Sequence, residues 1–353
     1  NVDEPGFRKL MKEQRDRAKA DARAKKSGHT DLSEYRKIID SAGATTFTGY
    51  SEMKSEGAIK AVMIDGKSVK DAPLNSDVEI ILDRTPFYAE GGGQLPDGGL
   101  ITLSNGSVIE IDDVQAPVPG LYVHRGQVIK GGVEVGEKVL AEIDRERRLA
   151  ISRAHTATHM VHKAFREALG ETATQAGSEN SPGRFRFDFP SAGAVPASIL
   201  SEVEERVNEL LIDNLKVTAQ IMSQPEAKAM GAMALFGEKY GDKVRVVSVG
   251  DWAHELCGGT HVSNSGELGL VKLISESSIG AGVRRVEALV GNDAYSFLAK
   301  EHLILNSITE LIKGAKIEEI PERISDLLDK VKTIEKEIQE LKTSQALDEA
   351  KEL

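Results

Sequence analysis

The sequence predicts an α+β fold in which a small β-barrel precedes a mixed α+β domain, with helical extensions at both ends. Between residues 45 and 144, short β-branched runs alternate with turn residues, a pattern typical of a small barrel or sandwich. From residue 145 to about residue 300, amphipathic helices mix with strands. The 353 residues are enough for two or three domains with separate cores.

Residues 1–44 are predicted to form a charged helical connector. The stretch 7–26 (FRKLMKEQRDRAKADARAKK) is rich in Lys, Arg, Ala and Glu and lacks Gly and Pro, which favours a helix. Its apolar side is thin, so we expect it to pack on something outside this chain. The chain starts with Asn rather than Met, and we expect it to be a fragment of a longer protein.

The barrel prediction for residues 45–144 depends on several short runs, such as DVEIILDRT and KVLAEID. The sequence SNGS at 104–107 separates two of these runs and predicts a tight hairpin turn. In the α+β domain, 145–300, a long helix is expected to end at Gly170. RFRFDF and KVRVVSVG are expected to be strands, and ASILSEVEERVNELLIDN an amphipathic helix.

Residues 301–353 are predicted to be helical and to carry a heptad seam. Apolar residues recur there at alternating spacings of three and four, which is typical of a coiled-coil surface. The seam consists of Ile324, Leu327, Val331, Ile334, Ile338 and Leu341. We expect this segment to lead to a further C-terminal domain and to offer a surface for self-association.

The composition limits the class of protein. A net charge of −11 argues against a surface that is basic throughout, and therefore against indiscriminate nucleic-acid binding. Local basic patches remain at 144–155, 183–187 and 282–287, where solvated surface charge is an equally good interpretation. No apolar run is long enough to span a bilayer. A single cysteine forms no internal disulfide, so we expect a cytoplasmic protein with neither a membrane nor DNA as partner.

Two pairs of side chains have the spacing of metal ligands. His155 and His159 lie four residues apart in a predicted helix and would project from one face. Alone, such a pair of histidines more often belongs to the core or the surface than to a metal site. Cys257 and His261 form a second pair, and the two glycines between them allow a tight loop. Together they supply four ligands of the type that tetrahedral zinc prefers, so we expect one Zn²⁺ per chain with Cys257 as thiolate.

Segments in and around these pairs resemble alanyl-tRNA synthetase, in particular its editing domain. They are RTPFYAEGGGQLPDGG (84–99), RAHTATHMVHKAFREALG (153–170), TQAGSENSPGRFRFDF (174–189), CGGTHVSNSGELG (257–269) and SSIGAGVRRVEALVG (277–291). The resemblance covers roughly residues 1–300. It implies that the class II ligase body, which binds ATP and alanine, lies before Asn1, and that GAGVRR is a strand–turn–strand element of the editing domain.

The resemblance implies hydrolysis of the ester that joins serine or glycine to the 3′-terminal adenosine of tRNA(Ala). The parent enzyme would attach alanine to tRNA(Ala) with ATP. A ligase pocket for alanine excludes glycine poorly, because one methylene is worth only about 1–3 kcal/mol. Serine is larger than alanine, so a second, hydrolytic site has to detect the serine hydroxyl through a polar partner.

The resemblance also implies roles for individual residues. Gln175 is placed in the editing pocket, as a candidate catalytic residue and the first candidate for sensing the hydroxyl; the alternative is that it is an exposed turn residue. Further candidates for substrate binding are Thr156, Thr158, Gly91, Gly92 and Gly93. The glycines would present bare backbone N–H groups, or would simply form a barrel turn. Independently of the resemblance, the basic patches at 183–187 and 282–287 make Arg184, Arg186, Arg284 and Arg285 candidate tRNA contacts.

Three other interpretations stay open. The chain could be a stand-alone trans-editing deacylase of the same superfamily. It could be a non-catalytic module for tRNA docking and oligomerisation, in which zinc only holds the fold. A cysteine hydrolase that uses Cys257 with His261 or His254 is the third, but it leaves the His155/His159 pair without a role. Within the zinc hypothesis, a closed sphere of four ligands favours a structural site, whereas activation of water needs an open position.

Overall fold

The computed structural model describes residues 32–233, 241–312 and 316–352. The expected helix at 7–26 lies outside the described residues. Contacts divide the chain into two compact units, Asn1–Gly291 and Asn292–Leu353. We expected the α+β domain to extend to about residue 300, but the first unit ends at Gly291. There the backbone takes a φ of +66°, which ends the last strand and allows a helix to start at once.

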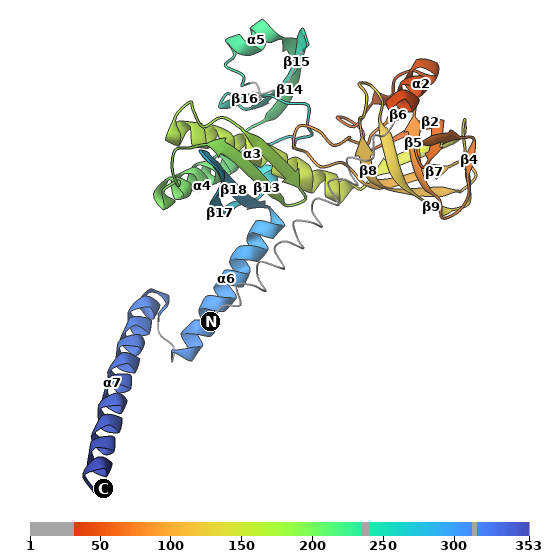
Figure 1. The fold of residues 1–353 in the computed structure, drawn as a ribbon. Helices are drawn as coiled ribbons and strands as arrows, with labels where there is room; N and C mark the ends of the chain where they lie inside the picture. The colour runs from red at the N-terminus through yellow and green to blue at the C-terminus, as the bar shows by residue number, and fades with distance from the viewer. Residues whose placement is uncertain (1–31, 234–240, 313–315, 353) are drawn as a thin grey trace. The chain divides into compact units, whose positions relative to one another are not determined.

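Six antiparallel strands of the first unit close into the predicted β-barrel (Figure 1). The strand order is β11, β7, β8, β9, β5 and β2, and β2 pairs again with β11. Their bounds are β2 (Lys54–Ile64), β5 (Asp77–Leu82), β7 (Gly99–Leu103), β8 (Val108–Gln115), β9 (Val123–Lys130) and β11 (Lys138–Ile143). The short strands are β1 (Thr46–Phe47), β3 (Lys67–Val69), β4 (Asp71–Ala72), β6 (Arg84–Thr85) and β10 (Val133–Glu134).

Alternation of buried and exposed side chains explains why this part folds as a barrel. In β11, Val139, Ala141 and Ile143 are buried in the barrel core, and the residues between them are exposed. The predicted turn at 104–107 joins β7 to β8, and Leu103 N donates to Ser107 O at 2.9 Å. The local sequence pattern therefore predicted both the strands and their connection.

The described end of the expected connector packs on the barrel. Helix α2 (Leu32–Ala42) buries Tyr35 and Ile38 in a cluster with barrel residues such as Met63 and Ile81. The Tyr35 hydroxyl donates to Glu79 Oε2 at 2.7 Å. This helix therefore packs on the barrel through an apolar face formed by Tyr35, Ile38 and Ile39.

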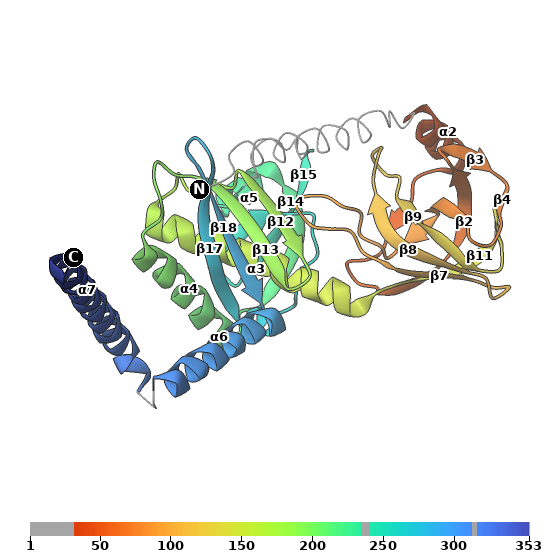
Figure 2. The same ribbon diagram turned by 60° about the horizontal axis from the view of Figure 1, so that its bottom comes forward.

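The α+β part contains two antiparallel sheets and the helices packed on them (Figure 2). The first sheet has the order β12, β13, β18, β17, with bounds β12 (Gly177–Ser181), β13 (Arg184–Pro190), β17 (Val271–Gly280) and β18 (Val283–Val290). The second has the order β14 (Val217–Ser223), β15 (Lys243–Val249), β16 (Ala253–Leu256). The helices are α3 (Arg145–Leu169), α4 (Ala197–Ile212), α5 (Gln224–Ala229) and the short 3-10 helix η1 (Ser265–Leu268).

The core of this part forms where α3 and α4 pack against the first sheet. Along β13, Phe185, Phe187 and Phe189 are fully buried and alternate with arginine or aspartate. Phe165 of α3 lies against them, with its ring centroid 4.9 Å from that of Phe189. The GAGVRR segment forms the predicted hairpin between β17 and β18. The α+β fold class is therefore confirmed.

The second unit consists of α6 (Asn292–Leu311), the 3-10 helix η2 (Ile317–Glu319) and α7 (Ile320–Glu352). The predicted heptad residues lie on α7 and are 39–65% exposed. No helix in residues 32–233, 241–312 and 316–352 is both long and apolar enough to cross a membrane.

Candidate metal centre

Helix α3 carries the first pair of predicted ligands on its buried side. The helix begins after Asp144, whose carboxylate accepts a hydrogen bond from Arg147 N at 3.0 Å, and it ends at Gly170. His155 is 3% exposed and His159 is 5% exposed. Their ring centroids are 5.1 Å apart, as expected for side chains one helical turn apart.

The second pair comes from the loop that follows β16. Cys257 N donates to Arg245 O at 3.0 Å, which ties the start of the loop to β15. At Gly259 the loop passes directly over His155, so that a Cβ atom there would overlap the imidazole. Glycine is therefore required at this position for Cys257 and His261 to reach α3.

The four predicted ligands meet at one point. The ligand atoms of His155, His159, Cys257 and His261 all lie within 4.8 Å of one another. Cys257 Sγ lies 3.5 Å from His155 Nε2 and 3.3 Å from His261 Nε2. Sulfur and nitrogen ligands of one tetrahedral zinc ion would be about 3.5 Å apart, given Zn–S and Zn–N bonds of about 2.3 and 2.0 Å. The cluster is therefore compatible with one metal ion.

Each histidine has a partner at Nδ1, which leaves Nε2 to face the cluster. His155 Nδ1 lies 2.9 Å from Gln94 Oε1, and His261 Nδ1 lies 3.0 Å from Thr156 Oγ1. His159 Nδ1 lies 3.4 Å from Glu255 Oε2. Such outer partners fix the tautomer and the orientation of metal-binding imidazoles, so the three histidines are prepared to bind through Nε2.

Burial keeps the three imidazoles neutral. It lowers the pKa of His155 and of His261 well below the usual value, and neighbouring histidines act in the same direction. Burial also lowers the pKa of His159, partly opposed by Glu255. The positive charge of Arg245 contributes to all three shifts. A neutral imidazole keeps the lone pair that a metal needs.

Gln94 was not singled out from the sequence as an individual site residue, although it ends the GGGQ motif. Its side chain is fully buried and reaches the cluster from the barrel. Oε1 accepts from His155 Nδ1 and from Thr260 N, and Nε2 donates to Thr260 Oγ1 at 2.9 Å. At Gly93 a Cβ atom would overlap Ser178. Gly93 thus allows a close approach to β12, whereas Gly91 and Gly92 have no such contact with it, and Gln94 orients the predicted ligand His155.

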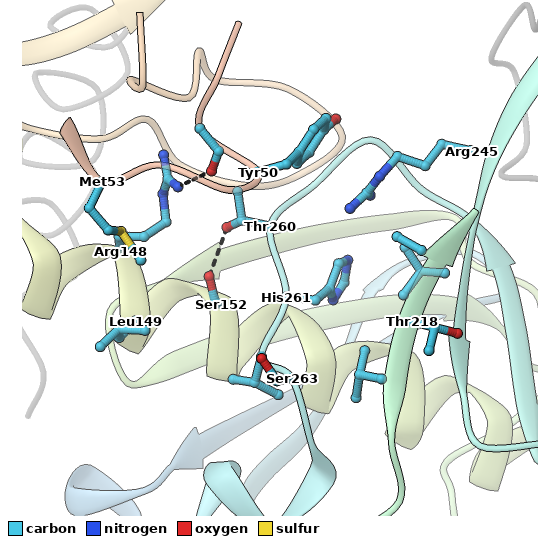
Figure 3. A pocket seen from close by; sticks show the side chains of 15 residues that line it. Tyr50, Met53, Arg148, Leu149, Ser152, Thr218, Arg245, Thr260, His261 and Ser263 are labelled. Carbon is cyan, nitrogen blue, oxygen red and sulfur yellow. Dashed lines mark hydrogen bonds between the residues drawn. The ribbon is translucent and has the colours of Figure 1, made fainter. Parts of the chain in front are cut away.

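A pocket of about 220 Å³ lies beside His261, between the barrel and the α+β part (Figure 3). Tyr50 and Met53 come from the segment before β2, and Arg245 extends from β15 toward the space between Tyr50 and His261. The polar residues of the wall also include Arg148, Ser152, Thr218, Thr260 and Ser263. A small polar substrate in this pocket would lie next to the cluster.

The predicted threonines make hydrogen bonds inside the protein. Thr156 Oγ1 donates to Ser152 O at 2.8 Å and accepts from His261 Nδ1. Thr158 Oγ1 lies 2.6 Å from Asn180 Oδ1. Thr156 therefore helps to orient His261, one of the four clustered side chains. A role for either threonine in sensing a serine hydroxyl stays a prediction.

Gln175 lies just before β12 and is half-buried. Its Nε2 donates to Ser178 Oγ at 3.0 Å, on the side where Gly93 approaches. It is not among the described residues that line the pocket beside His261. Its role as the hydroxyl sensor therefore also stays a prediction.

The four arginines predicted as tRNA contacts all form ion pairs on the first sheet. The pairs are Arg184–Glu287 (2.5 Å), Arg186–Glu179 (3.1 Å), Arg284–Glu276 (2.6 Å) and Arg285–Asp188 (2.7 Å). Each carboxylate offsets the charge of its arginine, which weakens long-range attraction of a phosphate backbone. Their contact with tRNA stays a prediction.

We expect Glu255→Gln to weaken metal binding about 10- to 100-fold. Glu255 is 1% exposed, and its carboxylate faces His159 Nδ1 and His162 Nδ1, the latter at 2.8 Å. A glutamine amide accepts from only one of these N–H groups and turns an NH₂ toward the other. Competition with a zinc-binding chelator measures the affinity. Glu142→Gln, on the exposed side of β11, is the control and should leave the metal affinity unchanged. Equal affinities for wild type and Glu255→Gln would contradict this role.

Two family models match parts of the chain. Residues 1–147 match a model described as class II (A) tRNA synthetases, which covers the connector and the barrel. Residues 244–287 match the second additional domain of threonyl and alanyl tRNA synthetases, which includes Cys257 and His261.

Similarity to known proteins extends over the whole chain. The chain is 60% identical over all 353 residues to an alanine–tRNA ligase of Nocardioides sp. and 58% identical to that of Acidothermus cellulolyticus. It is 57% identical to the alanine–tRNA ligase of Streptomyces avermitilis over 99% of its length. The chain spans only 39–40% of the length of these relatives. Its residues are therefore homologous to one continuous part of alanine–tRNA ligases.

Proposed function

We propose that this chain is the editing part of an alanine–tRNA ligase and hydrolyses tRNA(Ala) that carries serine or glycine. The observation that carries the proposal is the convergence of His155, His159, Cys257 and His261 beside a polar pocket. The similarity of the whole chain to one part of alanine–tRNA ligases supports it, as does the match to an additional domain of threonyl and alanyl enzymes.

The donor set fits zinc better than a harder cation. It contains three neutral imidazoles and one thiol, with no carboxylate in the inner set. Soft and borderline ligands of this kind select zinc over magnesium or calcium. When bound, the zinc ion would supply Lewis acidity near the ester carbonyl.

The remaining chemistry belongs to the residues of the chain. Hydrolysis adds a water oxygen to the acyl carbon, breaks the bond to the ribose 3′ oxygen and leaves a proton on that oxygen. Ser152 and Thr260 present hydroxyls to the pocket, held by a 2.8 Å contact between them and by Gln94. They can orient the ester and the attacking water, because each hydroxyl both donates and accepts. Gln175 is proposed to recognise the serine side chain.

We propose further roles for the parent enzyme and for helix α7. The parent ligase would attach alanine to tRNA(Ala) with ATP in a part outside this chain, and the aminoacylated 3′ end would then move to the pocket. The exposed apolar face of α7 would mediate self-association. We expect the whole enzyme to work in the cytoplasm.

The assay that tests the proposed function follows deacylation of tRNA(Ala) charged with serine, glycine or alanine. The expected result is fast release of serine and glycine and slow release of alanine. A docking module would release none of them faster than buffer does. A cysteine hydrolase would remain active after the metal is removed and would lose its activity when Cys257 is replaced.

We expect Gln175→Leu to slow release of serine several-fold to about 100-fold and to affect release of glycine much less. The leucine side chain cannot pair with the serine hydroxyl, and glycine has no hydroxyl to lose. Both rates are measured at equal metal content. Gln127→Leu, an exposed substitution on β9, is the control. Equal slowing of both substrates would show that Gln175 positions the ester instead.

A further inference from the structure

Arg245 is held rigidly at the pocket by neutral groups. Its Nη1 donates to Cys257 O at 2.8 Å and to Gly259 O at 3.0 Å. Its guanidinium lies over the Tyr50 ring, 4.1 Å from the ring centroid. Tyr50 is itself fixed, because its hydroxyl donates to Gly258 O at 2.7 Å. The guanidinium therefore has one orientation before any ligand arrives.

The charge of Arg245 is not offset by a carboxylate among the described residues, in contrast to the four arginines of the first sheet. Within the same residues, its hydrogen bonds to protein atoms all come from Nη1. Nε and Nη2 are therefore available to a ligand. Two parallel N–H groups of a guanidinium match two oxygens of a phosphate.

We infer that Arg245 binds the 5′-phosphate of the terminal nucleotide when the aminoacylated 3′ end of the RNA occupies the pocket beside His261. The inference rests on the proposed function and specifies how its substrate is held. In an aminoacyl ester of RNA the carboxyl group is esterified and the amino group is cationic. Phosphate is thus the only anion that the substrate can offer to Arg245. The ring of Tyr50 forms an apolar wall for the same nucleotide.

The placement agrees with the position of the reacting ester. The 5′-phosphate and the 3′ ester are on opposite sides of one ribose. Arg245 and His261 both line the pocket, and the guanidinium is anchored to the loop between Cys257 and His261. A phosphate on Arg245 would therefore direct the 3′ oxygen of the same nucleotide toward the cluster.

The test measures binding, so it does not depend on hydrolysis. The probe is 3′-deoxy-3′-serylaminoadenosine, an amide analogue of the ester, with and without a 5′-phosphate. Calorimetry with the metal-loaded chain should show that the phosphate lowers Kd about 10- to 100-fold. In Arg245→Gln the two probes should bind with nearly equal Kd, and the metal content should be unchanged. Arg153→Gln, which also removes a guanidinium that donates to a carbonyl, is the control and should keep the preference.

Three results would overturn the inference: no binding of either probe to wild type, equal affinity of the two probes for wild type, or a preference that survives in Arg245→Gln. The first two do not involve a variant. If Arg245→Gln loses metal, Arg245→Lys is used instead. Lysine keeps a donor for the two carbonyls but lacks the two parallel N–H groups of a guanidinium. The preference for the phosphorylated probe should then fall severalfold. The deacylation assay separately decides the proposed function, so the two can fail independently.

Discussion

Cys257→Ala should lose most of its metal, whereas wild type should contain about one equivalent of zinc per chain. The thiolate is the only sulfur ligand of the cluster, and its removal leaves three neutral imidazoles. Metal analysis of the purified proteins measures the content. A lower melting temperature should accompany the loss, because metal binding to a folded site adds to the stability of the fold.

His254→Ala is the matched control for this experiment. His254 is close to Cys257 in the sequence, but its Nδ1 lies 2.8 Å from Ser248 Oγ and it is not part of the cluster. Its replacement should leave the zinc content at about one equivalent. Full zinc content in Cys257→Ala would show that Cys257 is not a ligand and would revive its interpretation as a nucleophile.

Asp97→Asn should lower the free energy of unfolding by about 3–5 kcal/mol, because it leaves a buried guanidinium without its counterion. The side chains of Arg148 and Asp97 are 2% and 0% exposed and form an ion pair between α3 and the barrel. Arg148 also donates to Gly49 O at 2.6 Å and to Pro86 O at 2.8 Å. The pair therefore fixes the barrel loop that forms one wall of the pocket.

Denaturant unfolding followed by the fluorescence of Trp252, the single tryptophan, measures this loss. Glu52→Gln is the control, because the Arg84–Glu52 pair has side chains 44% and 40% exposed. Exposed pairs contribute at most about 1 kcal/mol. Similar losses in the two variants would show that the Arg148–Asp97 pair does not hold α3 to the barrel.

Local patterns in the sequence predicted much of the fold. RFRFDF has the two-residue period of a half-buried strand, and β13 buries its three phenylalanines. The turn at 104–107 has a similarly local cause, whereas the hairpin in GAGVRR was expected from the resemblance and not from a local pattern. That each of the two pairs of cluster residues would lie close together could be predicted, because the spacing within each pair sets its own geometry. The point where the two pairs meet depends on the tertiary fold. In the sequence it was suggested by the matching ligand types of the two pairs and by the family resemblance.

Long-range polar contacts could not be predicted in the same way. Gln94 and His155 are 61 residues apart, and Arg148 and Asp97 are 51 apart, so no local period relates them. A buried arginine or glutamine looks like a surface residue in the sequence until its partner is known. The opposite holds for the four arginines predicted to contact tRNA, which look like free basic patches in the sequence. The acidic residues that pair with them lie on neighbouring strands, and two of these partners are distant in the sequence.

Dependence of the reaction on the metal cluster is measured by the deacylation rate of serine-charged tRNA(Ala) as zinc is restored to metal-stripped protein. We expect the stripped protein to be inactive and the rate to rise in proportion to bound zinc until about one equivalent is bound. Alanine-charged tRNA should remain stable throughout. A stripped protein that deacylates as fast as the reloaded one would contradict the claim that the cluster of His155, His159, Cys257 and His261 is the centre of the reaction.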